Sequence, residues 1–305
     1  MTIGRRPAAL RTALALALAT LVVGAALPAC GKDGKPSTES AGKIIRVTGI
    51  PDENPTELQR KYQPMVDYLK AQLGTEVQYV PVTDYGAAVQ ALSAGKIDFA
   101  WLGGFTHVQA RVMDGAVPLC MRDIDRQFKS IFIAGADSGI ATPADLKGTT
   151  FAFGAKSSTS GHLMPRHFLL TELKIDPETD FSGKPLYSGA HDATVKMVES
   201  GKVAAGALNI EVWERILREN KVDTSKVKVI WTTPPFVDYV WTARKDVDPK
   251  LRDAFTKAFL DLDPAKPEHA AVLALQGAKK FVPASPADFD ATEKVARSTG
   301  LLAGK

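Results

Sequence analysis

The chain has 305 residues, 45% hydrophobic and 24% charged, with a formal net charge of +4 at pH 7. This length suffices for one large or two medium hydrophobic cores. Three arginines lie in the first 29 residues, so the remainder has 35 basic residues (38 − 3) against 34 acidic ones, a net charge of +1. This near-neutral remainder has no basic run interleaved with aromatic residues, which argues against nucleic acid as a partner.

The N-terminal segment has the pattern of a secretory leader. Its three arginines precede an apolar run over residues 12–26, and the sequence LPAC follows, ending at Cys30. The run is too short to span a bilayer comfortably, so we predict a leader over residues 1–29 that is removed. LPAC also resembles a bacterial lipobox, which predicts lipidation of Cys30 and a membrane anchor. The alternative is a plain secretory leader with an incidental cysteine.

Residues 30–43 are polar and rich in glycine and serine, as expected of a flexible tether between a lipid and a folded domain. Beyond Cys30 there is one other cysteine, Cys120, so no internal disulfide can form. Cys120 lies in the apolar stretch AVPLC and is expected to be a small buried hydrophobic residue.

Strand and helix patterns alternate from Ile44 onward. Strands are expected at 44–50, 76–82, 97–102, 149–154, 203–208, 226–231 and 238–243. Helices are expected at 57–73, 85–95, 160–173, 192–201, 210–220 and 248–262. This alternation predicts an α/β fold with parallel sheets covered by helices on both faces.

Two glycine- and proline-rich breaks, at 135–143 and 232–236, bracket about one hundred residues, a plausible domain size. They predict a two-lobed protein in which the chain crosses between lobes twice. Lobe 1 would comprise residues 44–134 and 236–305, and lobe 2 residues 135–235. Ligands of open α/β sheets bind at the carboxyl ends of strands, so the cleft between the lobes is the expected site.

One helix entrance is unusually rich in hydroxyl groups. Residues 157–165 read SSTSGHLMP, with four hydroxyl side chains before Gly161. An ordinary N-cap uses one hydroxyl and gains about 1 kcal/mol, so capping alone does not explain the other three. The alternative is that hydroxyl groups, free backbone N–H groups and the positive helix end together bind an anion.

Polar and small residues also follow other predicted strands. The segments are GIPDENP (49–55), TDY (83–85), WLGGFTH (101–107) and YSGAHDA (187–193). If they face one cleft, they supply many hydrogen-bond donors and few fixed charges. His191 could donate to an anion, which would favour its cationic form, or it could bond to backbone at a helix start. Tyr85 and Trp101 could line a pocket or serve only in packing.

Metal binding and the common catalytic motifs have no support in the sequence. His162 and His167 are five residues apart, about 140° around a helix, and so do not share a face. No cysteine or acidic residue stands at ligand spacing from them. The sequence contains no GxSxG, no Walker loop and no dinucleotide-binding glycine motif. We therefore expect no metal, no cofactor and no enzyme activity.

Several motifs together resemble the phosphonate/phosphite/phosphate-type solute-binding proteins of bacterial ABC importers. They are VTDYGAAVQAL, GKIDFAWLGG, DLKGTTFAFG, SSTSGHLMP and SGAHDA, and the resemblance covers Ile44 to about Leu302. Within that family GIPDENPTEL, WLGGFTHVQAR, GALNIEVWE and WTTPPF are most similar to a branch described as selenate-binding proteins. The resemblance implies the type II periplasmic-binding-protein fold.

The resemblance also implies a set of binding residues. Ser158, Thr159 and Ser160 match a Ser-Thr-Ser whose hydroxyls and amides hold the oxyanion, His191 matches a histidine at the ligand, and Tyr85 a tyrosine that reaches it from the other lobe. The chain departs from the family where Trp101-Leu102-Gly103-Gly104 replaces Tyr-x-Gly-Pro and where Phe128 stands in place of a tyrosine.

Two acidic residues bear on which oxyanion binds. Glu211 and Asp238 lie near where the aminophosphonate binders of the family place carboxylates. Sulfate and selenate only accept hydrogen bonds, so a carboxylate would repel them, whereas phosphite, phosphate and phosphonates can carry a proton. If both residues face the cleft, protonated or amino-bearing ligands are favoured. If both point to solvent, selenate or sulfate is favoured. Glu211 could also lie on the solvated face of its helix.

The expected function is that of a lipid-anchored, monomeric substrate-binding protein at the outer face of the membrane. It would close its lobes over a small tetrahedral oxyanion and deliver it to an ABC permease with its ATPase. Two alternatives stay open at this stage. One is a hydrolase of phosphate or sulfate esters that uses one of the serines with His191, and the other is the ligand-binding domain of a signalling system.

Overall fold

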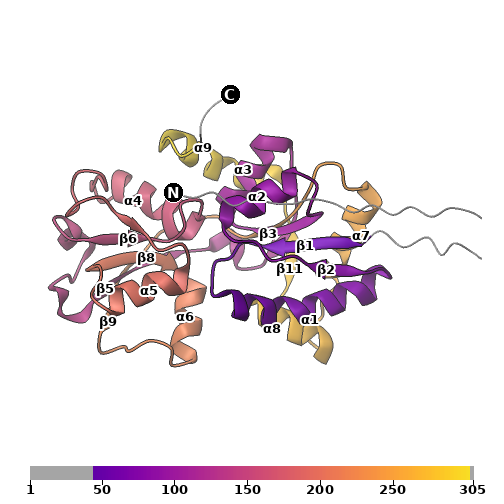
Figure 1. Cartoon of the computed structure of the whole chain (residues 1–305), viewed down its shortest axis with the longest axis horizontal. Coiled ribbons are helices and arrows are strands. Elements are labelled where there is room, and N and C mark those ends of the chain that lie inside the picture. Colours follow the sequence, from indigo (N-terminus) through magenta and orange to yellow (C-terminus); the bar gives the residue numbers. More distant parts are fainter. Residues whose placement is uncertain (1–43, 303–305) are drawn as a thin grey trace, which may run out of the picture. The chain divides into compact units, whose positions relative to one another are not determined.

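The computed structural model describes residues 44–302, so the predicted leader, the tether and Cys30 lie outside the described part of the chain. Two mixed sheets form the framework (Figure 1). In spatial order the first sheet contains β11 (Phe281–Pro283), β4 (Val117–Arg122), β10 (Val240–Ala243), β3 (Phe99–Leu102), β1 (Ile45–Gly49) and β2 (Val77–Tyr79). The second contains β7 (Leu186–Tyr187), β6 (Phe151–Phe153), β8 (Ala205–Asn209), β5 (Ser130–Gly135) and β9 (Val227–Thr232).

Helices cover both sheets, as the alternating pattern predicted. The first sheet carries α1 (Pro55–Leu73), α2 (Tyr85–Ser93), α3 (Gly104–Asp114), α7 (Pro249–Leu260), α8 (Pro267–Gln276) and α9 (Asp290–Ser298). The second carries α4 (Met164–Thr171), α5 (His191–Glu199) and α6 (Ile210–Arg218). In Figure 1, α1 and α8 lie on one side of the first sheet and α2 and α3 on the other. The α/β class is confirmed.

The expectation that both sheets are parallel is wrong. β1 runs parallel to β2 and β3, but β10 is antiparallel to β3 and β4. In the second sheet β6 runs parallel to β7 and β8, whereas β5 is antiparallel to β8 and β9. β11 is likewise antiparallel to β4. Two of the reversed strands, β5 and β10, are the ones through which the chain enters each sheet after leaving the other. Such a strand follows no local strand–helix–strand unit, so nothing requires it to be parallel.

The second passage between the sheets, from the end of β9 at Thr232 to the start of β10 at Val240, contains the predicted break at 232–236, whereas the first does not coincide with its predicted break. β4 ends at Arg122 in the first sheet, and β5 begins at Ser130 in the second. The first passage therefore precedes residue 135, where the sequence placed it. Phe128 and Phe236 form an isolated antiparallel bridge where the two passages run side by side. The lobe boundaries themselves stay a prediction.

Apolar packing explains why these elements form. The largest buried cluster includes the first sheet with α1, α2 and α7, and its aromatic centre stacks Phe99 on Phe255 at 3.9 Å between ring centroids. Two further clusters lie on the two faces of the second sheet, around Val195 on one side and Phe151 on the other. Cys120 is free and fully buried, as predicted from its apolar surroundings.

Candidate ligand-binding site

The hydroxyl-rich segment forms a tight turn at the start of a helix. Residues Thr159–Leu163 adopt one turn of π-helix that leads directly into α4. Ser158 is the N-cap, and its Oγ accepts a hydrogen bond from the Gly161 N–H at 2.9 Å. All three residues Ser158, Thr159 and Ser160 are at least 98% buried. Three hydroxyl residues thus lie side by side in a buried turn at the N-terminal end of a helix, where the positive end of the helix dipole favours an anion.

Backbone groups at the start of α3, which packs on the first sheet, contact this turn and Asp238. The Phe105 N–H donates to Thr159 Oγ1 at 3.0 Å, and the Gly104 N–H donates to Asp238 Oδ1 at 3.0 Å. A Cβ on Gly103 would stand 2.9 Å from Thr159 Oγ1 and 3.1 Å from Asp238 Oδ1, so only glycine allows this approach. The N-terminus of α3 therefore lies against both the serine-rich turn and Asp238.

Asp238 is a buried carboxylate with one unpartnered oxygen. Its side chain is 1% exposed, and Oδ2 forms no hydrogen bond within the described structure. Burial raises the pKa of Asp238 to about 7, although the Gly104 N–H and the nearby hydroxyls of Thr159 and Ser160 lower it. Asp238 can therefore exchange a proton with a bound ligand near neutral pH.

His191 is a neutral ring that bonds to backbone through Nδ1, one of the two roles that the sequence left open. The ring is fully buried, and burial lowers its pKa. The Asn209 N–H donates to Nδ1 at 3.3 Å, so Nδ1 is the acceptor and the remaining proton is assigned to Nε2. Nε2 is buried and has no partner among the described residues. A Cβ on Gly161 would come within 3.0 Å of the His191 ring, so the histidine lies against the serine-rich turn.

Tyr85 reaches the same corner from the first residue of α2. Its hydroxyl is buried and makes no well-aligned hydrogen bond in the described part of the chain, although Ser158 lies close enough to affect its pKa. Burial raises that pKa well above its usual range, so the hydroxyl keeps its proton. We call the group formed by Tyr85, Ser158, Thr159, Ser160, His191 and Asp238 the polar corner.

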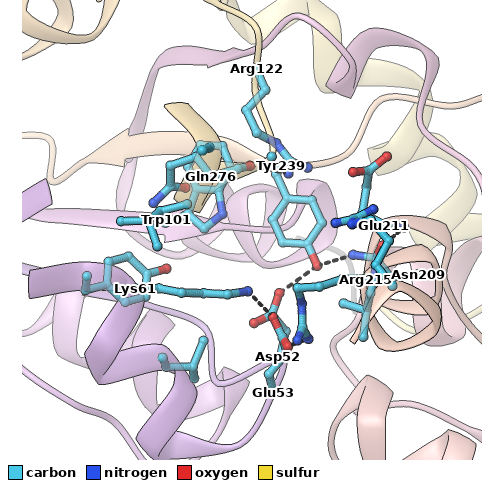
Figure 2. A pocket seen from close by; sticks show the side chains of 17 residues that line it. Asp52, Glu53, Lys61, Trp101, Arg122, Asn209, Glu211, Arg215, Tyr239 and Gln276 are labelled. Atoms are coloured by element: carbon cyan, nitrogen blue, oxygen red, sulfur yellow. Dashed lines mark hydrogen bonds and ion pairs between the residues drawn. The ribbon is translucent and has the colours of Figure 1, made fainter. Parts of the chain in front are cut away.

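Glu211 and Trp101 lie elsewhere, in a separate charged pocket (Figure 2). The pocket is lined by Asp52, Glu53, Leu58, Lys61, Tyr62, Trp101, Arg122, Asn209, Glu211, Val212, Arg215, Arg218, Tyr239, Ala274, Leu275, Gln276 and Gly277. Burial raises the pKa of Glu211, so this carboxylate is partly removed from water. Of the two acidic residues considered in the sequence, Asp238 thus belongs to the polar corner and Glu211 does not.

Sequence reasoning missed three residues at the boundary of these regions. The Tyr239 hydroxyl donates to Asp52 Oδ2 and accepts from Asn209 Nδ2, both at 2.9 Å. Asp52 stood in the segment GIPDENP, and Tyr239 directly follows Asp238. Their partnership joins positions 187 residues apart in the chain, so no local signal pairs them.

Among the described residues, no group of three or more His, Cys, Asp or Glu residues is suited to a metal ion.

Comparison with known proteins decides the family. Residues 47–289 match the family described as "ABC transporter, phosphonate, periplasmic substrate-binding protein". This chain belongs to that family. A probable ABC transporter phosphite binding protein of Prochlorococcus marinus MIT 9301 is 36% identical to this chain, over 85% of this chain and 91% of the relative. A phosphate-import protein of Mycolicibacterium smegmatis is 28% identical over 93% of this chain and 96% of that relative.

Solved structures agree with this assignment. The Prochlorococcus protein in complex with methylphosphonate superposes with a TM-score of 0.82 at 34% identity, covering 85% of this chain and 99% of that one. The aliphatic sulphonate binding protein of Escherichia coli, at 16% identity and a TM-score of 0.59, shares the fold. The type II periplasmic-binding-protein fold expected from the resemblance is confirmed.

Family membership also bears on activity and partners. Members of the family are substrate-binding proteins of ABC importers, which bind a small ligand and work with a permease and an ATPase; they are not enzymes. The hydrolase alternative is therefore not supported. Within residues 44–302, no helix is long and apolar enough to cross a membrane.

Proposed function

We propose that this substrate-binding protein captures a small tetrahedral phosphorus oxyanion that carries one proton, of the phosphite, methylphosphonate or phosphate type, in the polar corner. The observation that carries the proposal is the set of three buried, unpartnered polar atoms that border the serine-rich turn. They are the Tyr85 hydroxyl, His191 Nε2 and Asp238 Oδ2. Two of these groups are donors and the third is a proton acceptor, which together match an oxyanion that has both oxygens and a proton.

The proton distinguishes this ligand class from sulfate and selenate. A phosphate-type group has a second pKa of about 6, so it holds or readily takes up one proton near neutral pH. Asp238, with a pKa of about 7, can share that proton through Oδ2. A fully deprotonated anion would instead face a buried carboxylate without a proton between them, which is repulsive. We therefore favour a protonated phosphorus oxyanion over selenate as the ligand, despite the similarity to the selenate-binding branch.

Neutral dipoles supply the remaining binding energy. Charge-assisted hydrogen bonds contribute roughly 1.5–3 kcal/mol each, and micromolar affinity needs about 8 kcal/mol. The hydroxyls of Ser158–Ser160, the backbone N–H groups of the turn, Tyr85 and His191 are enough donors for this purpose, with no lysine or arginine in the polar corner. The ligand would then pass to a permease. Anchoring through a lipid on Cys30, a periplasmic or extracytoplasmic location in the cell envelope and a monomeric state belong to the same proposal.

A panel of oxyanions tests the ligand class. We expect phosphite, methylphosphonate or phosphate to raise the free energy of unfolding by RT ln(1 + [L]/Kd), about 2.7 kcal/mol at one hundred times Kd. Thermal melting and isothermal titration calorimetry on the full chain would measure this, with sulfate and selenate alongside. Ser160→Ala should weaken the effect. Selenate or sulfate binding more tightly than every phosphorus oxyanion would contradict the proposal.

A further inference from the structure

His162 belongs to the serine-rich turn but has no free polar atom to offer a ligand. It lies in the π-turn Thr159–Leu163 and is 1% exposed. Its Nδ1 lies 2.7 Å from the Lys156 carbonyl oxygen, and its Nε2 lies 3.1 Å from Arg166 Nε. His191, by contrast, keeps an Nε2 without a partner among the described residues. The two buried histidines at the turn therefore have different roles.

The partners of His162 fix its tautomer. The Lys156 carbonyl can only accept a hydrogen bond and Arg166 Nε can only donate one, so Nδ1 carries the proton and Nε2 does not. The Tyr187 hydroxyl, 3.3 Å from Nε2, can donate to it as well. Burial lowers the pKa of His162 to about 4, against the opposing effect of the Lys156 carbonyl, so the ring is neutral at neutral pH. A proton on Nε2 would face the N–H of Arg166.

Arg166 is itself held in place on helix α4. It is 9% exposed, and its Nη2 donates to Glu178 Oε1 at 2.6 Å. Its guanidinium carbon lies 5.6 Å from the centre of the Phe153 ring, and the His162 ring packs on the same phenylalanine at 4.8 Å between ring centroids. We call Lys156, His162, Arg166 and Glu178 the histidine clamp.

The histidine clamp closes the serine-rich turn on itself. The bond from the His162 ring to the Lys156 carbonyl spans six residues, and the three hydroxyl residues Ser158–Ser160 lie between its two ends. A backbone hydrogen bond of 2.8 Å, from the Gly154 N–H to the Gly161 carbonyl, joins the same two stretches of chain. The clamp is thus a side-chain link that fixes these hydroxyls relative to the start of α4.

We propose that His162 is a positioning residue, oriented by Arg166, that holds the serine-rich turn in its ligand-binding conformation before the ligand arrives. The inference rests on the proposed function and adds residues that act on binding without touching the ligand. A turn that is already ordered spares the ligand the free energy of ordering it. A loosened turn would be competent for only a fraction of the time, which lowers the apparent affinity by that fraction and slows association.

Nitrogen-15 NMR of the histidine side chains tests the tautomer in the full, ligand-free wild-type chain. At neutral pH we expect the ring hydrogen on Nδ1 in His162 and on Nε2 in His191. This measurement requires neither a ligand nor a variant. A His162 ring with its hydrogen on Nε2 would overturn the proposal, because such a ring cannot donate to the Lys156 carbonyl.

Asparagine and glutamine at position 162 separate positioning from packing. The amide nitrogen of asparagine takes the place of Nδ1 and can donate to the Lys156 carbonyl, whereas that of glutamine takes the place of Nε2. We expect His162→Asn to keep the Kd for phosphite within about threefold of the wild-type value. His162→Gln should raise it at least tenfold, chiefly through slower association, as measured by calorimetry and stopped-flow mixing. Packing alone predicts the opposite order, because asparagine is smaller and leaves the larger cavity.

His167→Asn is the matched control for these variants. His167 lies next to Arg166 on α4, is half-buried, and its ring forms no hydrogen bond within the described part of the chain, so the Kd and the association rate should stay unchanged. If His162→Gln does not fold, Arg166→Met replaces it, because it removes the donor to Nε2 and should also slow association.

The proposal would be overturned if His162→Gln bound phosphite as tightly as His162→Asn, or if the replacement variant Arg166→Met associated at the wild-type rate. Failure of the wild type to bind any phosphorus oxyanion would instead overturn the proposed function.

Discussion

Asp238 bears both on the proposed ligand class and on the stability of the protein. Its pKa of about 7 reflects burial at 1% exposure, opposed by hydrogen bonds that favour the ionised form. The folded-state pKa is higher than the ordinary value of 3.8, so the unfolded chain loses this proton more easily than the folded one. Stability from this group is therefore complete below about pH 4 and is lost as the pH rises through 7.

Asp238→Asn should stabilise the ligand-free protein at alkaline pH. Between pH 5 and pH 8 the cost of the buried charge grows by about 2–3 kcal/mol, and asparagine does not incur it. The gain in unfolding free energy over the wild type should thus be larger at pH 8 than at pH 5, as measured by urea denaturation at both values. The same variant should bind phosphite more weakly, because it has no carboxylate to share the proton. A gain that is equal at the two pH values would contradict the assignment of Asp238 as the titrating group.

At the scale of elements, the start of α4 combines a helix cap with residues of the proposed binding site. Ser158 caps the π-turn by accepting from the Gly161 N–H, which leaves its own O–H free to donate. The N-terminus of α7 is capped similarly by Asp248, which accepts from the Lys250 N–H at 2.7 Å, but α7 packs against the first sheet and carries no residue of the polar corner. The two caps allow the binding role to be separated from the capping role.

Ser158→Ala should cost about 1 kcal/mol of stability for the lost cap and also weaken phosphite binding about tenfold or more, the equivalent of one charge-assisted hydrogen bond. Asp248→Ala should lose a similar stability and keep the wild-type Kd. Thermal melts and calorimetry on both variants make the comparison. Equal Kd values for the two variants would show that Ser158 is only a cap.

At the scale of the whole described unit, ion pairs connect the elements around the two sheets. Glu53 follows β1, is 5% exposed, and pairs with Lys61 of α1 and with Arg215 of α6 on the second sheet. A more exposed pair joins Glu57 of α1 to Lys221 beyond α6 at 3.5 Å. These contacts, like the hydrogen bonds from Tyr239 to Asp52 and Asn209, join elements of the two sheets.

Glu53→Gln should weaken ligand binding without touching the polar corner. It leaves Arg215 and Lys61 without their shared partner in a mostly buried position, which we expect to cost about 2 kcal/mol or more and to appear chiefly as a faster dissociation of phosphite. Stopped-flow measurements of the dissociation rate would detect it. Lys257→Gln breaks an exposed pair between α7 and its C-cap residue Asp261 and should have no such effect. A dissociation rate unchanged by Glu53→Gln would mean that the ion pair does not contribute to the closed state.

The sequence by itself determined the α/β class and most helices and strands, and it predicted anion binding at the serine-rich turn, which stays a prediction. These features are local: helix α1 follows from its apolar spacing, and the hydroxyls of Ser158–Ser160 are adjacent in the chain. Only the tertiary structure decided that Asp238 lies in the polar corner and Glu211 outside it, that His191 is a neutral donor, and that β5 and β10 run antiparallel to their neighbours. These outcomes depend on residues that are far apart in the sequence. Examples are the hydrogen bonds between Gly104 and Asp238, between Asn209 and His191, and between Tyr239 and Asp52. Burial and such distant neighbours determine the protonation state and the hydrogen-bond partners of these side chains. A residue pattern along the chain does not reveal which neighbours will be brought together.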